Sequence, residues 1–149
     1  MPFICVYIHF VWRTKNGFPY LNSPQLRQKV WLHIKENAAS KGIFVDYVSG
    51  HCDHCHCLVS LTYKQTISKV MQLIKGECSH WINDNNLCKS KFEWQDEYYA
   101  VSVSQSKTKK VRQYIKNQEE HHKNKSFNDE VDEFVARYGF EKLYDLPSD

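Results

Sequence analysis

The chain has 149 residues, of which 42% are hydrophobic and 14% aromatic, so it can bury a substantial core. Its length fits a single domain, 1–149. No run of about 18 apolar residues is present, which excludes a membrane-spanning helix. The apolar N-terminal segment lacks the basic start and the cleavage site of a signal peptide, so none is expected.

The net charge of +3 hides an asymmetry between the two ends of the chain. Residues 1–126 carry 18 Lys and Arg against 10 Asp and Glu, a balance of +8, whereas residues 127–149 carry 2 against 7, a balance of −5. A basic body with an acidic C-terminal helix and tail, about 126–149, is compatible with nucleic-acid binding.

Six cysteines could form a disulfide framework, but their spacing argues against one. Cys52, Cys55 and Cys57 lie too close together for mutual bridges of good geometry, and the chain is not small enough to need such bridges. We therefore expect a reduced protein of the cytoplasm, in which the remaining cysteines are ordinary thiols.

The first predicted element is a strand over 3–12, rich in β-branched and aromatic residues on both faces, and therefore central in its sheet. Ser23 and Pro24 then supply the N-cap and first position of a helix that runs to Lys41 and ends at Gly42. The hydrophobic periodicities predict the remaining elements in this order: strands over 43–49 and 55–62, a helix from 66 that fades at 83–86, a strand over 92–104, a basic helix over about 107–123, and an acidic helix over 126–138 that Gly139 ends. The order indicates an α+β fold, an antiparallel-rich sheet with helices packed on it, of the ferredoxin-like or RRM-like split βαβ kind.

The stretch from His51 to Cys57 concentrates three histidines, three cysteines and an aspartate. Because residues two apart in a strand point the same way, His54 and His56 project from one face and the neighbouring cysteines from the other. Two adjacent imidazoles are half of a divalent-metal site. A pair of surface histidines is the simpler alternative. A structural zinc site is another, but no second Cys-x2-Cys or His-x3-His pair completes it.

The basic helix carries Tyr114 and Gln118 four residues apart, so both lie on one helical face. The simple interpretation is a half-buried tyrosine beside a solvated glutamine. A tyrosine hydroxyl is a poor nucleophile at neutral pH, because its ordinary pKa is near 10. It becomes useful when a metal polarises the phosphate that it attacks, as a metal on the histidine pair would.

Together, these motifs resemble those of the single-tyrosine HUH transposases of the small single-strand insertion sequences. The blocks that carry the resemblance cover roughly residues 3–140 and follow in the family's order: His9-Phe-Val-Trp-Arg-Thr-Lys15, Asp53-His54-Cys55-His56, Lys75-Gly76, the run from Trp94 to Ser104, and Tyr114-Ile115-x-x-Gln118-Glu119-x-His121-His122. One departure is Cys55, where the family more often has Val, Ile or Leu. A buried cysteine is a small hydrophobe, so we expect the geometry to survive.

The resemblance implies the HUH endonuclease fold and a DNA-cleaving and strand-transferring enzyme. His54, His56 and Gln118 would ligate Mg²⁺ or Mn²⁺, and Tyr114 would attack single-stranded DNA to form a 5′-phosphotyrosine. It also implies a homodimer, with a tyrosine helix able to serve the partner's histidine pair, and recognition of imperfect DNA hairpins. The basic residues expected to contact this DNA are Arg13, Lys15, Lys75, Lys107, Lys109, Lys110 and Arg112.

Three alternatives stay open. A host-domesticated REP-associated tyrosine transposase would share the chemistry, although that branch usually has longer chains with basic C-terminal segments. A non-catalytic RRM-like module would stack bases on exposed aromatics such as Tyr7 and Tyr47, but it leaves His54 and His56 unexplained. A metal-storage or metal-sensing protein would bind zinc without cleaving DNA.

Overall fold

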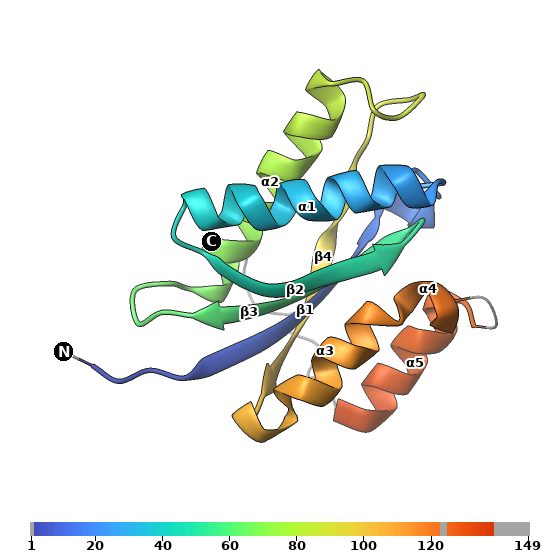
Figure 1. Ribbon diagram of the computed structural model, residues 1–149. Helices are drawn as coiled ribbons and strands as arrows, with labels where there is room; N and C mark the ends of the chain where they lie inside the picture. Colours follow the sequence, from blue (N-terminus) through green and yellow to red (C-terminus); the bar gives the residue numbers. More distant parts are fainter. Residues whose placement is uncertain (1, 123–124, 139–149) are drawn as a thin grey trace, which may run out of the picture.

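The computed structural model describes residues 2–122 and 125–138 (Figure 1). Its strands and helices largely follow the predicted order. They are β1 (Val6–Thr14), a 3-10 turn η1 (Lys15–Gly17), α1 (Pro24–Ser40), β2 (Phe44–His51), β3 (His54–Leu61), α2 (Ile67–Asp84), β4 (Trp94–Val103), a second 3-10 turn η2 (Gln105–Lys107), α3 (Thr108–Lys116), α4 (Gln118–His121) and α5 (Phe127–Tyr138).

The four strands form one antiparallel sheet in the order β2-β3-β1-β4. The first strand therefore lies at the centre, as its two apolar faces predicted. The helices α1 and α2 cover one face of the sheet, whereas α3 and α5 lie on the other (Figure 1). This arrangement confirms the α+β fold class, and it makes the sheet a partition between two helical layers.

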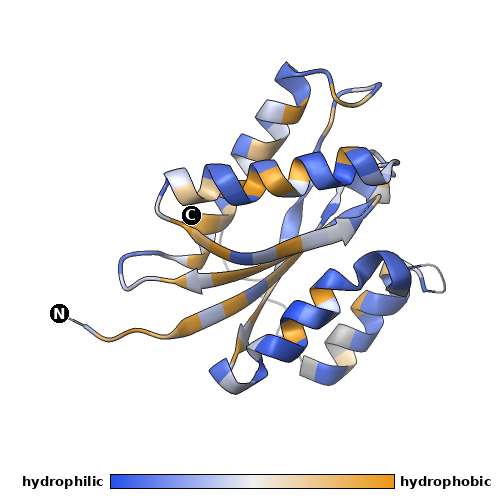
Figure 2. Cartoon of the chain, viewed as in Figure 1, coloured by the Kyte–Doolittle hydropathy of each residue, from blue (hydrophilic) through white to orange (hydrophobic). Residues whose placement is uncertain are grey.

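Side-chain alternation along the strands separates a hydrophobic core from a polar layer. Ile8, Phe10 and Trp12 of β1 point into the core beneath α1 and α2, together with Cys55 and Cys57 of β3. The predicted inward orientation of these two cysteines is therefore confirmed. Apolar stretches lie along β1 and β3 (Figure 2). The intervening residues of the same strands face α3 and α5.

The ends of the first two helices match their sequence signals. The Ser23 side chain accepts a hydrogen bond from the backbone N–H of Leu26, and Thr66 caps α2 in the same way through Lys69. Gly42 has a φ of +74°, a left-handed conformation that glycine adopts without strain. None of the helices in the described ranges is both long and apolar enough to cross a lipid bilayer.

The prediction of one continuous helix over 107–123 is wrong, because the helix is interrupted. The chain forms two helices, α3 and α4, because Asn117 between them has φ −90° and ψ 15° and does not continue the helix. Asparagine is a poor helix former, since its side chain competes for backbone hydrogen bonds. Gly139, the predicted end of the last helix, lies outside the described residues.

Gly50 allows β2 and β3 to approach closely beside the histidine pair. A Cβ atom at this position would lie 2.2 Å from the backbone oxygen of His54 and 2.9 Å from the Cα of Cys55. Because these are backbone atoms, we expect Gly50→Ala to lower the free energy of unfolding by about 1–3 kcal/mol, measured by urea denaturation.

The matched control for this change is Gly76→Ala. A Cβ atom on Gly76, inside α2, would meet nothing within 4 Å. Alanine favours the helix over glycine, so this variant should gain up to about 1 kcal/mol. Equal stability of the two variants would contradict the close approach at Gly50.

Candidate active site

The two histidines of β3 are buried and oriented by hydrogen bonds to their Nδ1 atoms. His54 Nδ1 donates to Oδ1 of Asp53 over 2.8 Å, and His56 Nδ1 shares a 2.9 Å hydrogen bond with Nε2 of His9. Both histidines have an exposed fraction of 0%. A partner on Nδ1 leaves Nε2 as the ligating nitrogen, which is how proteins orient metal-binding imidazoles. Both Nε2 atoms therefore face the layer of α3–α5.

Backbone hydrogen bonds hold the turn between β2 and β3 in place, and with it Asp53. The carbonyl oxygens of Cys52 and Asp53 accept hydrogen bonds from the N–H groups of Leu21, at 3.0 Å, and Thr14, at 2.9 Å. The Thr14 hydroxyl also donates to the Asp53 carbonyl over 3.2 Å. The end of β1 thus fixes the turn from which His54 projects.

Gln118 reaches the histidine pair from the opposite helical layer. Its Oε1 atom lies 2.8 Å from Nε2 of His54, and the side chain is fully buried. The next residue, Glu119, is bound by Nε of Arg27 over 2.6 Å, while Nη1 of Arg27 donates to the carbonyl oxygen of Leu21. Since Arg27 belongs to α1, this contact ties the start of α4 to the body of the protein.

Tyr114 lies on α3 beside the same histidines, half-buried. Its ring centroid is 5.6 Å from that of His56 and 6.3 Å from that of His9. An ion pair of 2.6 Å between Arg112 and Asp46 holds α3 against β2. The structure therefore brings together Tyr114, Gln118 and the histidine pair of the same chain.

A carboxylate from α5 completes this cluster. Glu130 is 1% exposed, and its Oε1 atom lies 2.7 Å from Nε2 of His56 and accepts a 2.5 Å hydrogen bond from the Tyr114 hydroxyl. Its Oε2 atom lies 3.7 Å from Nε2 of His54 and also contacts His122. Phe127, one turn earlier, stacks on the His54 ring at 4.5 Å and anchors the helix.

Burial shifts the acid–base properties of the cluster. Burial lowers the pKa of His56 to about 4, so this imidazole is neutral and able to ligate a metal. Burial and the nearby Glu130 charge raise the pKa of Tyr114 well above its usual range. Burial alone would raise the pKa of Glu130, but hydrogen bonds from His122 and His56 hold that pKa well below its usual value.

The donor set fits a divalent metal. Two imidazole Nε2 atoms and one amide oxygen converge from β3 and α4, and ligand atoms of His54, His122 and Glu130 all lie within 4.8 Å of one another. Imidazole, amide and carboxylate groups are all ordinary metal ligands. His54, His56 and Gln118 can therefore hold an ion, with Glu130 and His122 in reach of it.

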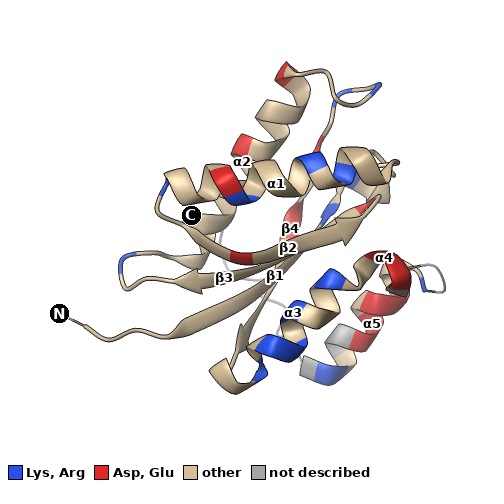
Figure 3. Ribbon diagram, in the orientation of Figure 1, with Lys and Arg blue, Asp and Glu red and all other residues tan. Residues whose placement is uncertain are grey.

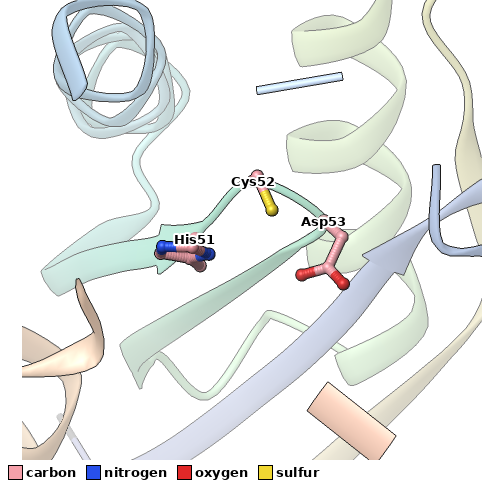
Figure 4. A group of neighbouring side chains, drawn as sticks. All are labelled: His51, Cys52 and Asp53. Carbon is pink, nitrogen blue, oxygen red and sulfur yellow. The ribbon is translucent and has the colours of Figure 1, made fainter. Parts of the chain in front are cut away.

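A second group of ligand atoms lies in the adjacent turn, where His51, Cys52 and Asp53 come together (Figure 4). The Asp53 carboxylate is already bound to His54. Burial and the Asp53 charge raise the pKa of the Cys52 thiol, which favours the protonated form that binds metals poorly. Cys55 lies in the core on the other face of the sheet, so the alternative of a zinc site with the Cys-x2-Cys spacing finds no support here.

The seven basic residues predicted to contact DNA separate into two groups. Lys107 and Lys110 line a cavity of about 380 Å³ beside Tyr114 and Glu130. Lys107 precedes α3, and Lys109, Lys110 and Arg112 within α3 make that helix basic, in contrast to the acidic α4 and α5 (Figure 3). The other three are Arg13, whose guanidinium lies over Phe127, and Lys15 and Lys75, which line a different cavity.

This second cavity, of about 830 Å³, lies between α2 and the start of β4 and includes none of the histidine cluster. Lys75 donates to the carbonyl oxygens of Gln95 and Asp96 over 2.6 and 3.0 Å, and Lys15 pairs with Glu93. Both lysines thus have structural partners, whereas Lys107 and Lys110 are exposed at the tyrosine.

Sequence reasoning assigned no role to four residues of the cluster: His9, Asp53, His122 and Glu130. A signal existed for His9, since a histidine inside an otherwise apolar strand needs a buried partner. Asp53 precedes the first histidine and was visible within the motif. Glu130 is one of several acidic residues in α5, and nothing in the sequence distinguishes it from its exposed neighbours.

The fold and this cluster together define a class of protein. A four-stranded antiparallel sheet that presents two histidines from an inner strand to a tyrosine helix is the arrangement of the HUH-fold tyrosine transposases. The sequence matches the model of the IS200-like transposase family over residues 3–118, and the chain belongs to that family. The resemblance stated from the motifs is therefore confirmed, and with it the general activity of DNA cleavage and transfer.

Two solved structures are similar in fold. One is a candidate transposase from Deinococcus radiodurans R1, with a TM-score of 0.63 and 20% identity, covering 78% of this chain and 93% of that one. The other is a REP-associated tyrosine transposase bound to a REP hairpin, with a TM-score of 0.59 and 18% identity, covering 100% of this chain and 90% of that one. No curated protein matches the sequence.

Proposed function

We propose that the protein is a metal-dependent single-stranded DNA transposase that cleaves and rejoins hairpin-marked ends of an insertion sequence. The observation that carries this proposal is the convergence of Tyr114 and Gln118 on the His54–His56 pair. A tyrosine beside a metal-binding donor set, on a family scaffold for DNA transfer, supports nucleophilic attack on a phosphodiester.

His54, His56 and Gln118 are the residues proposed to hold the metal. A bound Mg²⁺ or Mn²⁺ would supply Lewis-acid polarisation of a phosphate oxygen. The hydrogen bonds with Asp53 and His9 keep both imidazoles oriented for this role. Burial of the cluster excludes bulk water, which favours attack by tyrosine over hydrolysis.

Tyr114 is the proposed nucleophile. Its hydroxyl oxygen forms a bond to phosphorus while the bond from phosphorus to the 3′ oxygen breaks, which leaves a 5′-phosphotyrosine and a free 3′-OH. A different 3′-OH then attacks the phosphotyrosine, and this step rejoins the DNA and restores the tyrosine. Each step exchanges one phosphoester for another, so no external energy is needed.

The proposed partner is single-stranded DNA that carries imperfect hairpins. Lys107 and Lys110 beside the tyrosine would position phosphates, and Lys109 and Arg112 of α3 extend the same basic segment. Moving a DNA segment requires cleavage at both of its ends, and each chain carries one such tyrosine. We therefore also propose a homodimer, acting in the cytoplasm where its cysteines stay reduced.

A REP-associated tyrosine transposase is the second function to consider, because a structure of that kind bound to a REP hairpin has the same fold. It would use the same tyrosine and histidines on repetitive palindromes. Cleavage of a hairpin from the flanking element, with no cleavage of dispersed palindromes, would support the mobile-element function and exclude this one.

The experiment that tests the proposal is incubation of the purified protein with labelled single-stranded hairpin DNA from the flanking locus. With Mg²⁺ or Mn²⁺ present we expect a protein–DNA adduct that survives SDS, and peptide mass spectrometry should map the DNA to the peptide that contains Tyr114. EDTA should abolish the adduct. Folded protein that forms no adduct on these ends with either metal would overturn the proposal.

A further inference from the structure

Glu130 is an unusual carboxylate for a surface helix. The exposed positions of α5 include Asp129, Asp132 and Glu133, whereas Glu130 is buried at the point where α5 meets the sheet. Taking a carboxylate out of water is unfavourable unless charged or hydrogen-bonding groups compensate it. Glu130 lies one helical turn after Phe127, whose ring packs on His54.

The contacts of Glu130 converge on the proposed metal ligands. Oε1 lies 2.7 Å from Nε2 of His56 and 3.4 Å from Nε2 of Gln118, and Oε2 lies 3.7 Å from Nε2 of His54. The Nδ1 atoms of both histidines point elsewhere, to His9 and Asp53. The Glu130 carboxylate therefore lies beside the two Nε2 atoms that would face an ion, and a carboxylate is itself a metal ligand.

We propose that Glu130 is a fourth metal ligand, supplied by α5 to the site formed by His54, His56 and Gln118. The inference rests on the function proposed above and extends it, since none of the sequence motifs assigns a ligand to this helix. For binding, the ion must take the place of the 2.7 Å contact between Glu130 Oε1 and Nε2 of His56, and of the 2.8 Å hydrogen bond between Nε2 of His54 and Oε1 of Gln118.

The fourth ligand would also set the choice of metal. Two imidazoles and an amide form a neutral donor set that suits zinc or nickel as well as magnesium. A carboxylate adds a negative charge and a hard oxygen donor, which Mg²⁺ and Mn²⁺ prefer. The carboxylate should therefore contribute more to the binding of manganese than to that of zinc.

The test is the affinity of the full-length protein for Mn²⁺, without DNA, by isothermal titration and by loss of the free Mn²⁺ EPR signal. We expect Glu130→Gln to weaken Mn²⁺ binding about tenfold or more, and to weaken Zn²⁺ binding by a smaller factor. Glutamine keeps the size of the side chain, and circular dichroism melting verifies that the variant is folded.

Glu133→Gln is the matched control, because it removes the same charge from the same helix. Glu133 is exposed, with a side-chain exposed fraction of 61%, and pairs with Lys125, so its loss should leave Mn²⁺ affinity unchanged. If Glu133→Gln weakens binding as much as Glu130→Gln, only the charge of α5 matters and the proposal is wrong.

Two further results would overturn the inference. Unchanged Mn²⁺ affinity in folded Glu130→Gln would mean that the carboxylate does not ligate, and increased affinity would mean that it covers the site instead. Either result, with a wild-type protein that still forms the phosphotyrosine adduct, would leave the proposed function standing. Absence of the adduct in the wild type would instead reject the function itself.

Discussion

Tyr114→Phe is expected to abolish the covalent protein–DNA adduct, with cleavage lowered by about 10⁴ or more, as for loss of other enzymatic nucleophiles. The change removes one oxygen atom. The ring can keep its place beside His56 and His9, and α3 keeps its ion pair between Arg112 and Asp46. The measurement is SDS-resistant labelled DNA and released 3′-OH product, with Mn²⁺ present.

The same variant should still bind hairpin DNA and Mn²⁺, because phenylalanine leaves the basic helix and the imidazoles unchanged. Tyr63→Phe is the matched control, since Tyr63 is exposed and lies outside the cluster. It should form the adduct at the wild-type level. An adduct that persists in Tyr114→Phe would show that another residue is the nucleophile, and a loss in both variants would point to a nonspecific defect.

Features that depend on local sequence were predictable. The alternation of side chains along a strand assigned His54 and His56 to one face and Cys55 and Cys57 to the other, and the structure has this arrangement. A strand has a period of two, so a correct strand assignment leaves only one way to divide these residues. The caps at Ser23 and Gly42 likewise depend only on neighbouring residues.

Features that depend on contacts between distant segments were not predictable in the same way. The break at Asn117 shortens α3, and a continuous helix was the natural expectation from periodicity. Glu130 lies at the histidines on a helix whose Phe127 stacks on His54, a contact between residues far apart in the chain. His9 is buried against His56 through the register of β1 and β3. The periodicity of hydrophobic residues carries no information about which distant segments contact each other.

His56→Ala is expected to have the largest effect on metal binding. It removes one of the two imidazole ligands. It also takes one contact each from Nε2 of His9 and from Oε1 of Glu130, which keeps its hydrogen bond from Tyr114. We expect Mn²⁺ affinity to fall about 100-fold or more, and adduct formation to be lost with it. The loss of these buried contacts should also lower the free energy of unfolding by about 1–3 kcal/mol.

Isothermal titration with Mn²⁺ and urea denaturation measure the two effects separately. The control is His80→Ala, since His80 on α2 is exposed and forms a surface pair with Asp84. That variant should bind Mn²⁺ and form the adduct as the wild type does. Because an exposed pair contributes at most about 1 kcal/mol, its stability should change little. If folded His56→Ala kept wild-type Mn²⁺ affinity, the metal would lie elsewhere, and the turn of His51, Cys52 and Asp53 would be the next place to test.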